Sequence, residues 1–93
     1  MDQTTFESEL RRDGYADIVD RRMEANQFNP DHAHEFDARV LVLEGEMTIT
    51  HSGTAHTYRA GDMCALAAGT VHSERCGPAG ARYLAGRRDK SGS

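Results

Sequence analysis

The sequence predicts an all-β fold, a sandwich or barrel of short strands preceded by one short helix. Strand-like segments alternate with glycine-containing turns about every 8–12 residues, a spacing typical of such folds. Residues 46–51 alternate polar and apolar side chains, as a strand with one wet face does. Residues 40–43 are instead continuously apolar, which predicts a strand buried on both faces. With 93 residues, the chain has room for a single domain.

The first residues predict the helix. Thr4 or Thr5 is expected to cap a helix over residues 6–12, and Gly14 is expected to end it. The two apolar side chains of this segment are four positions apart and share one face. We expect that face to pack on the body of the domain.

The following elements are predicted by their polarity and their turn residues. Residues 16–28 carry many charged side chains and predict an edge strand with one wet face. Asn29-Pro30-Asp31 is typical of a turn. Four more turn signals follow, at residues 52–53, 60–62, 67–70 and 77–80. They separate predicted strands at residues 40–43, 46–51, 55–59, 63–66, 71–74 and 81–85.

Three histidines are the residues most suggestive of chemistry. His32 and His34 are two positions apart, so an extended segment would point both rings to the same face. His72 lies far along the chain in a second glycine-punctuated stretch. Neutral imidazoles are good ligands for transition metals, and three of them leave positions open for water or substrate. The alternative is a polar lining that binds no metal.

Two motifs in order resemble the cupin family of small jelly-roll barrels. The first is a His-x-His pair followed by an acidic residue or glutamine and then a glycine, here His32-Ala33-His34 leading to Gly45. The second opens with Gly-Asp and ends in histidine, here residues 61–72. The resemblance covers about residues 29–84. It implies an RmlC-like jelly-roll barrel that holds one divalent ion (Fe, Mn, Ni, Cu or Zn) on His32, His34 and His72.

This resemblance also suggests how the domain is divided. Residues 1–28 would form the helix and edge strand of the same domain, residues 29–86 the cupin barrel, and residues 87–93 a polar C-terminal tail. Burial in a homodimer is expected, because only 38% of the residues of the chain are apolar and its core is therefore small.

The chain departs from the family's pattern at the carboxylate. That position falls at Ala38, or at Arg39 when counted one residue later, and neither side chain can ligate as a carboxylate does. Asp37 could reach the metal only through a bulge. Glu74 would share the face of His72, where it could act as a general acid or base, ligate the metal, or pair with an arginine at the barrel rim. A second departure is Ala67 in place of the usual proline.

Residue type and strand position suggest which side chains line the pocket. The expected lining residues are Phe36, Met47, Ile49, Tyr58, Cys64 and Tyr83, although core packing is an equal or better interpretation for Cys64 and the tyrosines.

Composition excludes some classes of function. The formal net charge of −4 disfavours nucleic-acid binding. No apolar run approaches the roughly 20 residues of a membrane-spanning helix. The N-terminus does not resemble a signal peptide, and the two cysteines form no recognisable motif, so a cytoplasmic location with reduced thiols is expected.

Two hypotheses of function remain open. The first is a metal-binding cupin that binds or transforms a small organic molecule, by a dioxygenase-like reaction with non-haem iron or by isomerase or lyase chemistry. The second is a non-catalytic module that senses or binds a ligand. Fold and metal do not choose between them.

Overall fold

The computed structural model describes residues 1–89, which form one helix and six strands. Helix α1 spans Gln3–Arg12. The strands are β1 Ala16–Met23, β2 Phe28–His32, β3 Phe36–His51, β4 Thr54–Arg59, β5 Met63–Leu66 and β6 His72–Asp89. All their pairings are antiparallel. No helix in residues 1–89 is long and apolar enough to cross a membrane.

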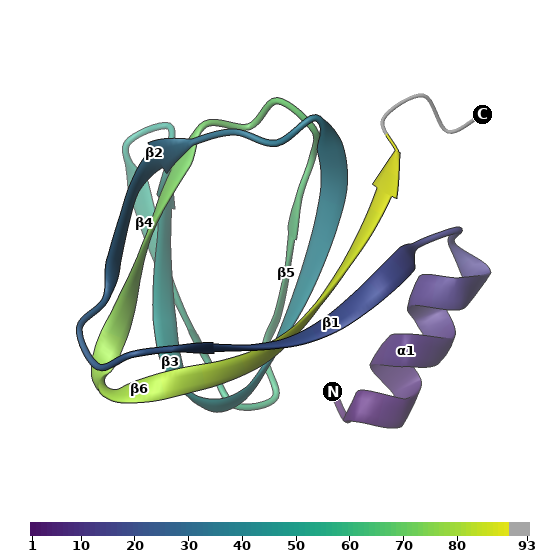
Figure 1. Cartoon of the computed structure of the whole chain (residues 1–93), viewed down its shortest axis with the longest axis horizontal. Coiled ribbons are helices and arrows are strands. Elements are labelled where there is room, and N and C mark those ends of the chain that lie inside the picture. Colours follow the sequence, from purple (N-terminus) through teal and green to yellow (C-terminus); the bar gives the residue numbers. More distant parts are fainter. Residues whose placement is uncertain (90–93) are drawn as a thin grey trace.

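The long strands β3 and β6 hold the barrel together. They pair with each other, β6 also pairs with β1 and β2, and β3 also pairs with β4 and β5. Both strands curve around the interior, as Figure 1 shows, with α1 outside the barrel beside β1 and β6. This is the predicted jelly-roll arrangement. The hairpin turn at Ser52-Gly53 and the bounds of β5 are as predicted from the sequence.

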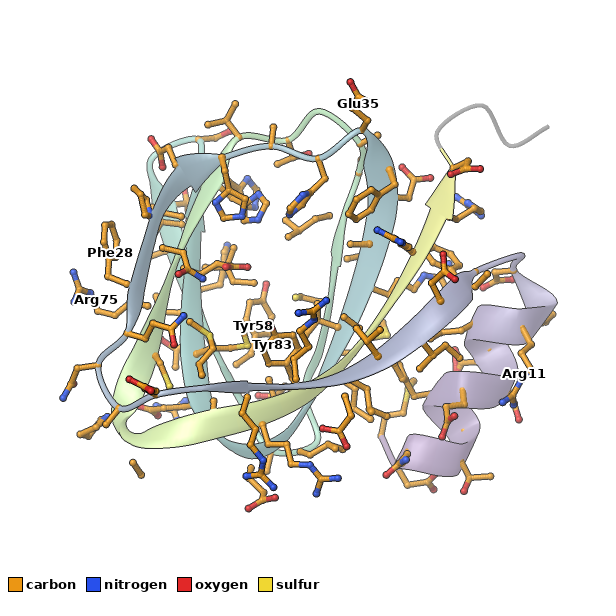
Figure 2. All side chains as sticks on the ribbon, viewed as in Figure 1. Arg11, Phe28, Glu35, Tyr58, Arg75 and Tyr83 are labelled. Carbon is orange, nitrogen blue, oxygen red and sulfur yellow. The ribbon has the colours of Figure 1, made fainter. Side chains whose placement is uncertain are left out.

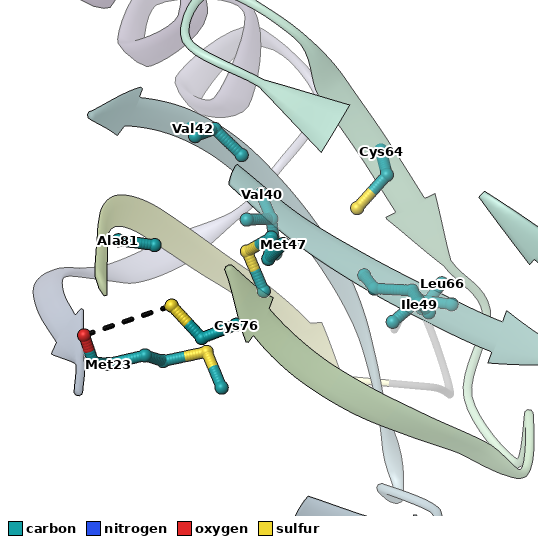
Figure 3. Close-up of a cluster of buried hydrophobic side chains, with 9 residues drawn as sticks. All are labelled: Met23, Val40, Val42, Met47, Ile49, Cys64, Leu66, Cys76 and Ala81. Atoms are coloured by element: carbon teal, nitrogen blue, oxygen red, sulfur yellow. Dashed lines mark hydrogen bonds between the residues drawn. The ribbon is translucent and has the colours of Figure 1, made fainter. Parts of the chain in front are cut away.

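The apolar run of β3 is buried on both faces, as its composition predicts. Val40 and Val42 point into the barrel and join its inner core, which includes Met47 and Cys76 (Figure 3). Leu41 points the other way, into a second core. That outer core contains two residues of α1, Phe6 and Leu10, together with Tyr15 and Leu84.

Helix α1 begins at Gln3, three residues before the predicted start at residue 6. Its cap is Asp2, whose carboxylate accepts a hydrogen bond of 2.8 Å from the backbone N–H of Thr5. The prediction of Thr4 or Thr5 as the cap is therefore wrong. Asp caps a helix as well as Thr does, and capping at Asp2 adds a further turn to α1. Gly14 has a positive φ just beyond the helix, as expected for the residue that ends it.

Two segments that the sequence predicts as turns belong to strands in the structure. Residues 29–31 belong to β2, and the turn lies earlier, where Asn26 has a φ of 60°. Pro30 is tolerated because β2 pairs with β6 alone and has an unpaired edge. Residues 77–80 lie within β6, where they are the extra residues of a register shift between the pairs Gly45 with Ala81 and Met47 with Cys76.

Gly45, the glycine of the first motif, has a steric role at this register shift. Its φ is 73°, and a Cβ added there would lie 2.0 Å from the carbonyl oxygen of Gly80. Only glycine lets β3 approach β6 so closely.

The predicted C-terminal tail is also wrong over residues 87–89, which form the end of β6. Arg88 donates a hydrogen bond to Asp37 and another to the carbonyl of Asp13, so it joins the strand to the segment after α1. Residues 90–93 lie outside the described part of the chain.

Candidate metal centre

Three histidines from two strands and one loop meet on the inside of the barrel. His32 is the last residue of β2 and lies directly opposite His72, the first residue of β6. His34 follows in the irregular segment between β2 and β3. One ligand nitrogen from each ring lies within 4.8 Å of the others, which is close enough for all three to converge on one ion.

Backbone contacts hold the second motif against the first. The N–H of Gly69 donates a hydrogen bond of 2.8 Å to the carbonyl of His34. The N–H of Ala68 donates one of 2.9 Å to the carboxylate of Asp37. These bonds fix the turn before β6 beside the loop that carries His34, and so His72 reaches the other two rings. The turn forms with Ala67 in place of the family's proline.

The rings are oriented by hydrogen bonds on their outer nitrogens. Nδ1 of His72 lies 2.9 Å from the carbonyl oxygen of Thr70, and Nδ1 of His32 lies 2.8 Å from that of Pro30. Because a carbonyl can only accept, each Nδ1 is the donor, and in the neutral ring this tautomer leaves the lone pair on Nε2. This is the arrangement in which histidine binds metals, with a second hydrogen bond that fixes the tautomer.

Burial and charge favour the neutral form of His34. Burial lowers its pKa below the usual value, and the neighbouring His32 and His72 lower it further. Neutral imidazole is the form that ligates a metal.

Glu74 stands beside the histidines, as its position two residues after His72 predicts. Its carboxylate oxygens lie 3.9 Å from Nε2 of His32 and 3.7 Å from Nε2 of His72. Asn29, directly opposite on β2, donates a hydrogen bond of 2.8 Å to this carboxylate. The pairing with an arginine that the sequence left open is replaced by this amide contact.

The carboxylate of the family's pattern is absent from the interior. Ala38 lines the cavity at that position, and Arg39 points to the other face, where its guanidinium lies 2.6 Å from Asp13. The carboxylate of Asp37 accepts a hydrogen bond from the N–H of Ala68 and lies 2.8 Å from the guanidinium of Arg88. These two contacts lower the pKa of Asp37. Figure 2 shows Glu35 pointing away from the barrel.

A cavity of about 380 Å³ opens beside the histidines. Of the residues predicted to line it, Phe36 and Tyr83 do so. The prediction is wrong for Met47, Ile49, Tyr58 and Cys64, which do not line the cavity but form or pack against the inner core. They face inward as expected, but they pack against one another and against the other side chains of the inner core. Burial raises the pKa of Cys64 to about 12, so its thiol is a protonated core group.

Several cavity residues were not identified from the sequence. The sequence predicts a turn at Asn29 and only a polar edge for β1, whose inner face supplies Asp17, Val19 and Arg21 to the cavity. The signal available was their spacing of two, which places all three on one side of a strand.

Comparison with known proteins identifies the family. A sequence profile described as the cupin domain matches residues 20–84. The chain belongs to the cupin family. A search of curated proteins gives no significant match.

Solved structures agree with the fold. An RmlC-like cupin from Shewanella frigidimarina is 23% identical, with a TM-score of 0.68 over 75% of this chain and 62% of that one. The cupin domain of Cnp3 from Schizosaccharomyces pombe is 15% identical, with a TM-score of 0.74 over 84% and 55%. A Drosophila melanogaster CENP-C structure, bound to CAL1, is 18% identical, with a TM-score of 0.69 over 76% and 60%. At these identities the likeness concerns the fold, and the chain spans only a little over half of each of these neighbours.

Proposed function

We propose that this cupin holds one divalent metal ion on His32, His34 and His72 and binds or transforms a small organic molecule in the adjoining cavity. The observation that best supports the proposal is the state of His72. Its side chain is 1% exposed, and Nε2 has no hydrogen-bond partner within residues 1–89. A buried polar atom without a partner is costly. A metal ion shared with the other two rings would satisfy it.

The donor set restricts the metal but does not select one. Imidazole nitrogens suit first-row transition metals, so Fe, Mn, Ni, Cu and Zn all remain open. When bound, such an ion would supply a Lewis-acidic centre with free coordination positions, and iron would add the redox chemistry of a dioxygenase-like enzyme.

Glu74 is the proposed acid or base. Asn29 holds its carboxylate at 2.8 Å, beside the histidines and on the wall of the cavity. A carboxylate so placed can take a proton from a ligand in the cavity and return it. The competing role is a fourth metal ligand in place of the absent carboxylate at position 38.

Elemental analysis tests the metal site directly. Protein purified without an affinity tag should contain about one transition metal ion per chain, because three preoriented histidines suffice for a site with open positions. His32→Ala and His34→Ala should lose it, and neither ring is fully buried, so both variants should fold. The matched control is His56→Ala, an exposed histidine on β4 outside the site.

The metal content of the variants tests the proposed site and distinguishes the two possible roles of Glu74. Wild-type protein without metal, or equal metal content in all three histidine variants, would contradict the proposed site. In the same assay Glu74→Gln should keep its metal if Glu74 moves protons. Loss equal to that of His32→Ala would make Glu74 a ligand.

A non-catalytic binding module is the second candidate, favoured by Ala38 at the carboxylate position. The fold supports such a role, since the CENP-C structure that resembles this chain is bound to a protein, CAL1. Oxygen uptake by the iron-loaded protein with a panel of enols, thiols and catechols distinguishes the two. Saturable binding of a panel member without turnover would favour the module.

We also propose that the protein is a homodimer in the cytoplasm. Phe28 and Val71 expose 49% and 57% of their surface, and Figure 2 shows Phe28 outside the barrel beside Arg75. A second copy could cover such residues. Sedimentation equilibrium should give twice the monomer mass, and a monomer would contradict the dimer.

The proposed location in the cytoplasm is supported by the cysteines. Both are free, which suits a reducing compartment.

A further inference from the structure

The cavity has a second charged region, away from the histidines, on the inner face of β1 and β6. Arg21 of β1 lines the cavity and lies directly opposite Tyr83 of β6, which lines it too. Val19 and Asp17 precede Arg21 at spacings of two and face the same way. Arg21 is therefore on the cavity side of its strand, although its side chain is also open to solvent.

Arg21 is the arginine of the cavity wall that no carboxylate pairs with; Arg22, on the other face of β1, is also without an ion pair among the described residues. Arg87, also in the cavity wall, is 3.2 Å from Asp17. Arg82 faces outward and is 2.6 Å from Asp20. Within residues 1–89, Arg21 forms no ion pair. A guanidinium carries five donors arranged as a fork, which fits the two oxygens of a carboxylate.

The residues around Arg21 indicate what chemistry the rest of a ligand would need. Burial raises the pKa of Tyr83, and the charge of Glu74 raises it further. The charge of Arg21 lowers it, but the pKa remains above the usual value, so the phenol is a hydrogen-bond donor at neutral pH. Much of the remaining wall is apolar and includes Val19, Phe36 and Ala85. The cavity thus offers a cation and a hydroxyl donor beside an apolar surface.

We propose that the cavity binds a small organic carboxylate with an apolar body, and that Arg21 selects it by pairing with its carboxylate group. This inference rests on the proposed function only in that the ligand occupies the same cavity. The metal site would face another part of the ligand, and Arg21 is a specificity residue with no part in holding the ion.

Benzoate and benzamide are suitable probes, because they share shape and apolar ring but differ in charge. Each is titrated into ¹⁵N-labelled protein, as purified and after zinc supplementation, and amide shifts give the Kd. Benzoate should bind more tightly than benzamide. Arg21→Gln should weaken benzoate binding about tenfold, the effect expected of one charge-assisted hydrogen bond.

The matched control is Arg22→Gln, because Arg22 is the next residue of β1, lies on the opposite face and does not line the cavity. It should leave the Kd for benzoate unchanged. Equal affinity of wild type and Arg21→Gln for benzoate, or equal affinity of the two probes for wild type, would overturn the inference. If the purified protein binds no metal, the metal proposal fails, yet the titration still reports on Arg21.

Discussion

The two faces of β3 carry different kinds of surface. Outward, Leu41 is 1% exposed and packs with Phe6 and Leu10 of α1 in a core that also contains Tyr15 and Leu84. Inward, Ala38 and Val40 border a cavity that also contains histidines and a glutamate. Beside Leu41, large side chains fill the outer side, whereas Ala38 and Val40 leave space on the inner side. Further along β3, Met47 and Ile49 close the inner side as well, so the inner face borders the cavity only near the start of the strand.

The contrast has an energetic meaning. A fully packed apolar cluster contributes favourable burial, while buried polar groups such as Nε2 of His72 oppose folding until they find a partner. We therefore expect substitutions in the outer core to alter stability and those of cavity-lining residues to alter metal or ligand binding.

Leu10→Ala should give the largest effect. Leu10 is 0% exposed and lies at the centre of the outer core. The truncation should lower the free energy of unfolding by about 2–5 kcal/mol, as buried leucines do. Urea denaturation measures this change, and elemental analysis of the folded variant should show an unaltered metal content.

The control on the same helix is Ser8→Ala, whose side chain is exposed and whose stability should remain close to wild type. A loss of metal from folded Leu10→Ala would show that the outer core also shapes the site and would contradict the separation of the two faces.

Ala38→Glu tests the inner face by supplying the missing carboxylate. Ala38 lines the cavity at the position where the family pattern has an acidic ligand. A carboxylate there should tighten metal binding, because it adds a charged donor to a set of neutral ones. Competition against a chelator measures the affinity, and weaker binding in the variant would count against Ala38 as a ligand position.

The turns and strands could be predicted from the sequence because they depend on local features, and the three histidines because the two motifs resemble those of the cupin family. Glycine turns, strand period and motif spacing gave β5, the hairpin at Ser52-Gly53 and the convergence of His32 with His72. Each of these is fixed by residues close in the chain or by the two motifs.

The lining of the cavity could not be predicted in the same way, because it depends on how the strands curve around one another. Cys64 faces inward, as a strand pattern allows, but ends in the core and not in the cavity. Whether an inward side chain meets space or its neighbours depends on curvature and on bulges such as that at Gly45. The positions of two arginines likewise depend on residues far along the chain. Arg21 lies opposite Tyr83, and Arg88 donates a hydrogen bond to Asp37.

The smallest effect concerns the outer side at acid pH. Hydrogen bonds from Arg12 and then Arg39 lower the pKa of Asp13 from 3.8 to about 2. Since the folded pKa lies below the unfolded one, Asp13 stabilises the fold above about pH 4, and this contribution disappears as the pH falls through 2. Asp13→Asn should therefore lower the urea midpoint slightly at pH 6, and the difference from wild type should shrink at pH 3. The effect is small because Arg12 is largely exposed and neither Asp13 nor Arg39 is fully buried, so water screens their attraction. An equal difference at both pH values would mean that Asp13 acts by packing and not by charge.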